Sequence, residues 1–196
     1  RYEAPGFTND GSAIPVNNNG TFMNDRMLAP VLGFDRSGLL QDRARRRRYG
    51  LEPDLRMARL EDDDARQFQY LRHDADWVNA DITVTTDAGQ IPIAPGYEVS
   101  SETVNGRVTP RFRTDAPIMH FFSIQSADYE VARDRWNDVE LAVYYDRHHP
   151  YNVDRMMRAM KVSFDVFTRE FSPFQFRQMR ILEFPAYAQF AQSFAN

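Results

Sequence analysis

The sequence predicts an α+β protein that is mainly antiparallel β and carries one strand-helix-strand unit near its C-terminus. Short apolar segments separated by Gly, Pro, Asn and Asp recur between residues 77 and 131, which is typical of an antiparallel sheet or sandwich. Residues 139–145 alternate apolar and polar side chains, as a half-buried strand does. The apolar period then lengthens to that of a helix from Val153 and returns to that of a strand at 179–184.

The first 36 residues are rich in Asn, Gly, Pro and Asp and show no sustained hydrophobic period. They contain more apolar side chains than a solvated tail would carry, so we expect turns and short edge strands there. Farther along, Ser37 is a candidate N-cap for a short helix over 37–48 that contains Leu39 and Leu40. Gly50 is expected to end this helix.

A run of arginines at 43–48, RARRRR, permits two interpretations. Basic clusters of this kind occur in nucleic-acid-binding and nuclear-localisation segments. The acidic residues at 61–64 follow closely, however, and we favour a solvated helix face paired with this acidic loop. The formal net charge of -4 argues against binding through phosphates, so we expect no nucleic-acid partner. The acidic run also lacks the alternating oxygen-ligand spacing of a calcium loop.

The central part of the sequence predicts short antiparallel strands. Ile82 and Val84 precede a DAG turn and Ile91 and Ile93 follow it, which predicts a hairpin. The polar segment DRWND at 134–138 ends this part of the chain. We therefore expect a β-rich domain over 1–137 and a second, smaller domain over 138–196.

The second domain opens with the strand-helix-strand unit. The apolar side of its helix is formed by Val153, Met156, Met157, Met160, Phe164 and Phe167. Asn152 is a candidate cap, Asp154 suits the positive end of the helix dipole, and Pro173 stops the segment that follows the helix. Since a crossover of this length usually joins parallel neighbours, the strands at 139–145 and 179–184 are expected to be adjacent and parallel.

The chain contains no recognisable catalytic or metal motif. It has no cysteine, and none of its four histidines stands in an H-E-x-x-H spacing. The P-loop, G-x-G-x-x-G and G-x-S-x-G motifs are absent as well. The adjacent His148 and His149 lie at a strand-to-helix turn, where neighbouring side chains point in different directions, so we expect a solvated loop there.

The composition, with 42% hydrophobic and 27% charged residues, is that of an ordinary soluble globular protein. There is no apolar run of about 18 residues and no signal peptide, so this sequence is not expected to span a bilayer. The sequence begins at Arg1 without Met and stops at Asn196 after a cluster of aromatic, Ala and Gln residues. We expect it to be a piece of a longer protein.

The last part of the sequence resembles a known family. The segments VELAVYY at 139–145, PYNVDRMMRAMKVSFDVFTREFSPF at 150–174 and RQMRILEFPAYAQFAQSFAN at 177–196 resemble the aminopeptidase N family of gluzincin zinc peptidases. More narrowly, they resemble its divergent members that are fused to, or encoded with, ABC-transporter permease segments. Upstream segments agree: NGTF at 19–22, RRRYGL at 46–51, DADWVNADITV at 74–84, IAPGY at 93–97 and PIMHFFSIQSADYEV at 117–131. The resemblance covers nearly the whole chain.

This resemblance implies a saddle-shaped β domain followed by the opening of a thermolysin-like catalytic domain, with the boundary near Asn137. It also implies, after the second strand, a Gly-x-Met-Glu-Asn segment that lies along the substrate and supplies a glutamate for its free amino group. Matched without gaps from Pro185, that segment falls on Phe190, Ala191, Gln192, Ser193 and Phe194. The first four of these are therefore the candidate substrate-binding residues.

Ser193 departs from the family pattern because it stands where the glutamate is expected. A neutral hydroxyl cannot provide the charge-assisted hydrogen bond that selects an ammonium group. The longer protein therefore either binds the amino group differently or is not a simple aminopeptidase. The alternative for 190–194 is an edge strand that only packs, since pairing with a peptide backbone requires no particular side chain.

Two functions remain open at this point. The first is a non-catalytic part of a larger, membrane-associated zinc aminopeptidase-like protein, contributing the β domain and part of a peptide-binding cleft. In that protein zinc-bound water would attack the peptide carbonyl, with the zinc ligands and the general base beyond Asn196. The expected partners are a peptide substrate, the rest of the catalytic domain and, through the longer protein, a membrane or ABC-transporter components. This chain would hold no cofactor and no catalytic residue, and it would lie on the extracytoplasmic side of a bacterial membrane.

The second function is an interaction or accessory domain of a transporter-associated membrane protein that has no peptidase activity. The departure at Ser193 motivates this alternative.

Overall fold

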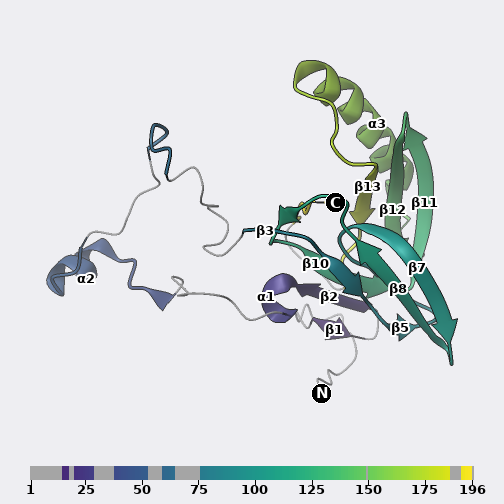
Figure 1. Ribbon diagram of the computed structural model, residues 1–196, viewed down its shortest axis with the longest axis horizontal. Coiled ribbons are helices and arrows are strands. Elements are labelled where there is room, and N and C mark those ends of the chain that lie inside the picture. The colour runs from purple at the N-terminus through teal and green to yellow at the C-terminus, as the bar shows by residue number, and fades with distance from the viewer. Residues whose placement is uncertain are drawn as a thin grey trace.

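The fold is described by a computed structural model for residues 15–17, 20–28, 38–52, 59–64, 76–148, 150–185 and 191–195. It confirms the predicted α+β class, because antiparallel sheets dominate and one long helix, α3 (Val153–Glu170), lies between two strands near the C-terminus (Figure 1). The same helix was predicted from its apolar period, and its 18 residues make about five turns.

One sheet combines the start of the chain with its centre. Its order is β1 (Val16–Asn17), β2 (Gly20–Asn24), β10 (Ser123–Ala127) and β6 (Ile91–Ile93), and all neighbours are antiparallel. The short helix α1 (Asp25–Leu28) follows β2. The prediction of edge strands in this segment is wrong for β2, because β2 lies between β1 and β10.

A second sheet projects from the molecule as a twisted hairpin (Figure 1). In it β8 (Arg107–Arg113) pairs with β7 (Tyr97–Val104), β4 (Asp81–Thr83) and β5 (Thr86–Asp87). A separate two-stranded pair joins β3 (Trp77–Val78) to β9 (Ile118–Met119).

The predicted hairpin around the DAG turn is wrong. A turn does form, since the Gln90 N–H donates to the Asp87 carbonyl at 3.0 Å. However, β4 pairs with β8, whereas β6 pairs with β10 of the other sheet. The reason is burial: Ile93 of β6 packs into a buried cluster with Tyr129 and Tyr144, whereas both ends of β4 are exposed.

The third sheet carries the strand-helix-strand unit. Its order is β11 (Tyr129–Trp136), β12 (Val139–Asp146) and β13 (Gln178–Leu182). β12 and β13 are parallel neighbours, which confirms the prediction from the length of the crossover. The predicted domain boundary at residue 137 falls in the two-residue turn between β11 and β12, which pair at eight residue positions. The division into two domains at this point remains a prediction.

Helix α3 covers one face of this third sheet (Figure 1). The buried residues between them are Val139, Leu141, Val143, Met160 and Phe164. The opposite face of β12 contributes Ala142 and Tyr144 to a second cluster with Ile93, Ala127 and Tyr129. Because β12 is buried on both faces, it is the central element of this part of the fold.

The residue before α3, Asn152, occupies the cap position that was predicted for it, but its side chain makes no capping hydrogen bond. Its backbone is left-handed, with φ of 62°, whereas a capping side chain requires an extended backbone. Only its carbonyl takes part, accepting from the Met156 N–H at 2.8 Å.

The arginine-rich helix α2 (Arg43–Arg48) begins later than predicted, so Leu39 and Leu40 precede it and Ser37 lies outside the described residues. The reason is the stronger cap at Asp42, whose carboxylate accepts from the Arg45 N–H at 2.7 Å. The left-handed Gly50 follows the helix, as expected.

The arginine run is exposed, apart from a half-buried Arg46, as a solvated helix face should be. The guanidinium of Arg46 donates to the carbonyl oxygens of Leu40 and Glu52. The pairing of this run with the acidic residues at 61–64 stays a prediction.

Candidate functional site

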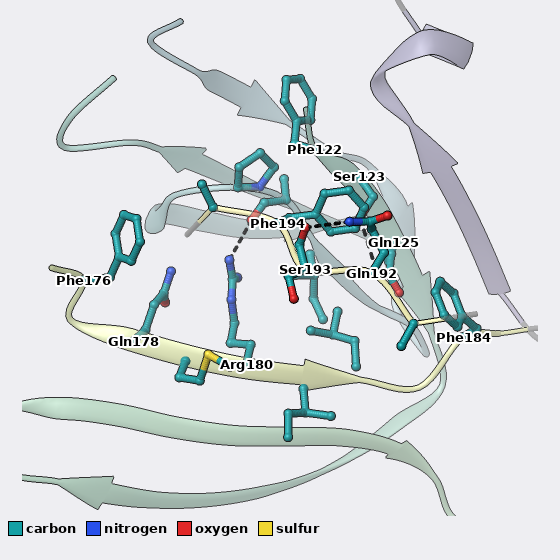
Figure 2. Close-up of a pocket in the computed structure, with 18 of the residues that line it drawn as sticks. Phe122, Ser123, Gln125, Phe176, Gln178, Arg180, Phe184, Gln192, Ser193 and Phe194 are labelled. Carbon is teal, nitrogen blue, oxygen red and sulfur yellow. Dashed lines mark hydrogen bonds between the residues drawn. The ribbon is translucent and has the colours of Figure 1, made fainter. Parts of the chain in front are cut away.

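A cavity of about 340 Å³ lies between β10 and β13, and residues 191–195 form one of its sides (Figure 2). The other lining residues come from 93–95, 122–125 and 174–184. Figure 2 shows Gln178 and Arg180 on β13, and Gln192, Ser193 and Phe194 on the segment that passes across the cavity from them. Strands from two different sheets and the end of the chain therefore converge at this point.

Three of the four predicted substrate-binding residues line this cavity, namely Ala191, Gln192 and Ser193. Phe190 lies outside the described residues. The segment 191–195 is irregular, so the alternative of an edge strand is not formed by these residues. Its shape is held by local contacts, because Gln192 Nε2 donates to the Ser193 carbonyl at 3.0 Å and the Phe194 ring packs on Phe121 at 5.2 Å. Whether these residues bind a substrate remains a prediction.

The start of β13 is fixed against the segment 94–97 by hydrogen bonds. Arg180 Nη2 donates to the Ala94 carbonyl at 3.1 Å, and Gln178 Nε2 donates to the Gly96 carbonyl at 3.0 Å. Alternate residues of a strand point to the same face, so Gln178 and Arg180 both leave the sheet on the side away from α3. These bonds place one wall of the cavity relative to the other.

Gly96 is required at this junction. Its φ is +92°, and a Cβ atom at this position would lie 2.4 Å from the carbonyl carbon of Arg113. Glycine is the residue that adopts such a backbone without steric cost. The close approach of 94–97 to β8 therefore depends on this residue.

Gln125 contributes a buried amide to the cavity wall. It lies on β10, is only 6% exposed, and donates from Nε2 to Ser123 Oγ at 3.2 Å. Its Oε1 atom is buried and accepts no hydrogen bond. A buried acceptor without a donor is costly, and in native proteins most such atoms are paired with protein or water. Because this oxygen is buried within the wall, it does not face the open space of the cavity.

The remaining walls are largely aromatic. Phenylalanines from three segments line the cavity: Phe122, Phe174, Phe176, Phe184 and Phe194. Several are fixed by edge-to-face contacts, including Phe174 with Phe176 at 5.6 Å and Phe184 with Phe22 at 4.9 Å. Such rings favour an occupant that has an apolar or aromatic surface of its own.

The electrostatic character of the cavity is set by Arg180. Among the described lining residues it is the sole charged side chain, and none of them is Asp or Glu. Burial lowers the pKa of Arg180, and the neighbouring Tyr144 and Tyr97 act in the opposite direction. Because a guanidinium titrates far above neutrality, Arg180 stays positively charged at physiological pH.

Two histidines in the described part of the chain lie outside this cavity. His148 is 80% exposed and contacts Asp146 at 2.8 Å between Nδ1 and Oδ1, which confirms a solvated loop for this residue. His120 Nε2 lies 3.6 Å from Oδ2 of the buried Asp25. His73 and His149 are not among the described residues. Across those residues, no three His, Asp or Glu side chains come together in a group that could hold a metal ion.

Sequence reasoning missed Gln125, Arg180 and the paired phenylalanines Phe174 and Phe176. One signal was present: Arg180 stands between the apolar residues Met179 and Ile181, and a charged side chain on the inner face of a strand often marks a site. No comparable signal marked Gln125.

Within the described ranges, no helix has the length and apolarity needed to cross a bilayer. No protein-family model matches the chain, and no curated protein has a significant match to it.

Proposed function

We propose that this chain forms the β part and one wall of the peptide-binding cleft of a larger, membrane-associated zinc aminopeptidase-like protein, and that it does not itself catalyse hydrolysis. One observation carries the proposal: the cavity between β10 and β13 is bordered by Ala191, Gln192 and Ser193. The family resemblance assigns these same positions to a substrate-contacting segment. The parallel crossover from β12 through α3 to β13 agrees with the expected opening of such a catalytic domain.

In this role the chain binds and orients a peptide. The aromatic walls hold an apolar side chain of the peptide. In the larger protein zinc would activate a water molecule for attack on the peptide bond. The described part of this chain provides no group of three metal ligands, so no step of hydrolysis is assigned to its residues. We also assign the larger protein to a bacterial membrane, with this part on the extracytoplasmic side and ABC-transporter components as partners.

Three measurements on the purified chain test the proposal: zinc content, hydrolysis of fluorogenic aminoacyl substrates, and binding of short phenylalanine-containing peptides by calorimetry. We expect no stoichiometric zinc, no hydrolysis, and measurable peptide binding. Ser193→Trp should block binding by filling the cavity. Ser101→Trp is the control, because it places the same side chain on the exposed strand β7. This variant should bind the peptides as tightly as the unaltered chain does. Bound zinc, peptide hydrolysis or a complete lack of peptide binding would each contradict the proposal.

A second candidate function is an interaction domain in a transporter-associated membrane protein without peptidase activity. The observation that favours it is a row of exposed apolar residues on α3 and just after it: Val162, Val166, Phe167 and Phe171. The peptide titration separates the two functions, because an interaction domain of this kind would leave the cavity between β10 and β13 empty of peptide.

A further inference from the structure

We infer that the cavity between β10 and β13 accepts an uncharged aromatic or large apolar residue of a peptide and disfavours a free amino terminus. The inference rests on the proposed peptide-binding function and specifies the class of peptide that binds. Aminopeptidases select a free ammonium group, so this preference would distinguish the present cleft from that of a simple aminopeptidase.

The charges around the cavity support this preference. A buried ammonium group requires an anionic or strongly hydrogen-bonding partner to offset its desolvation. None of the described lining residues is a carboxylate, and Ser193 is neutral at the position where the family resemblance places a glutamate. Arg180 adds a positive charge on the opposite wall. An ammonium group placed here would be desolvated beside a like charge.

The size and walls of the cavity indicate which side chain it accepts. A volume of about 340 Å³ is at the lower end of the range for ligand pockets, roughly 300–1,000 Å³, and suits one large side chain with its adjoining peptide groups. Phe122, Phe174, Phe176 and Phe184 line it with aromatic side chains. An aromatic ring gains additional attraction from such walls, beyond the burial of its area.

The test compares three small probes with the full 196-residue chain by calorimetry at about pH 6, where an α-amino group is charged. N-acetyl-phenylalaninamide is uncharged, phenylalaninamide carries an ammonium group, and N-acetyl-glycinamide lacks the ring. We expect the uncharged phenylalanine probe to bind at least about tenfold more tightly than either of the others, a difference of about 1.4 kcal/mol. At about pH 9.5 the amine of phenylalaninamide is neutral, and its binding should strengthen toward that of the acetylated probe.

One variant assigns the preference to a residue. Ser193→Glu places a carboxylate at an exposed position on the cavity rim and should narrow or reverse the preference against phenylalaninamide. Ser193→Gln is the matched neutral control at the same position and should leave the preference unchanged.

Two results would overturn the inference, and they differ in what else they affect. If phenylalaninamide binds the unaltered chain at about pH 6 as tightly as the acetylated probe, the inference fails while the proposed peptide binding stands. If neither phenylalanine probe binds, both the inference and the proposed function fail.

Discussion

Replacing Phe164 by alanine tests whether α3 is held on the third sheet by aromatic packing. The Phe164 ring is 8% exposed, stacks on Trp136 at 5.1 Å and meets Phe174 edge-to-face at 4.7 Å. Truncating a buried phenylalanine costs about 3–5 kcal/mol through lost burial and the cavity that remains. Each aromatic pair adds about 0.5–1.5 kcal/mol to the stabilisation that burial alone provides. We therefore expect Phe164→Ala to lower the free energy of unfolding by an amount in the upper part of the range of about 3–5 kcal/mol. Because Phe174 also lines the peptide cavity, the same change should weaken peptide binding.

The assay is urea denaturation followed by far-ultraviolet circular dichroism, with Phe167→Ala as the control. Phe167 lies almost one turn farther along α3 but is 57% exposed, so its loss should reduce the free energy of unfolding by less than about 1 kcal/mol. If the two variants lose the same free energy of unfolding, or if Phe164→Ala loses less than about 1 kcal/mol, this account of how α3 packs is refuted.

Three further predictions concern the backbone and the surface charges. Gly96→Ala should lower the free energy of unfolding by about 1–3 kcal/mol, because Gly96 has a φ of +92°. Gly89 has open space around it, so Gly89→Ala should be tolerated. Thermal melts of the two variants test this difference. Two hydrogen bonds from Arg111, at 2.7 and 2.6 Å, lower the pKa of Asp81 from 3.8 to about 2. Because the pKa of Asp81 is lower in the folded state, the stabilisation from its ion pair is present above about pH 4 and is lost between about pH 4 and 2. Asp81→Asn should therefore flatten the pH dependence of the denaturation midpoint in that window. An unchanged pH profile would contradict this role of Asp81. Asn137→Ala should cost about 1 kcal/mol, because Asn137 has φ of 48° in the β11–β12 turn, while Asn137→Gly should cost nothing measurable in the same melts.

The strand-helix-strand unit could be predicted from the sequence because its elements differ in hydrophobic period. The helical spacing of Met160 and Phe164 reflects the contact of α3 with one face of the third sheet, to which β12 contributes Val139, Leu141 and Val143. The pairing of β6 could not be predicted in this way. Its choice of β10 over β4 depends on where Ile93 finds burial, and that is decided by the tertiary arrangement.

The candidate site was predicted in part. The family resemblance led to Ala191, Gln192 and Ser193, which do line the cavity. The partners across from them, Gln125 and Arg180, come from strands more than fifty residues apart. Periodicity indicates which way a side chain points from its own strand, but it does not indicate which other strand that side chain will face. For this reason the polar groups of the cavity emerged only from the structure.

The most direct test of the central claim, that the cavity between β10 and β13 binds peptide, is nuclear magnetic resonance mapping of the bound N-acetyl-phenylalaninamide. We predict that the largest chemical-shift changes fall at 123–125, 178–182 and 191–195, which border the cavity from three sides. Changes confined to the exposed apolar side of α3, at 162–171, or an absence of any change at saturating probe would contradict the claim.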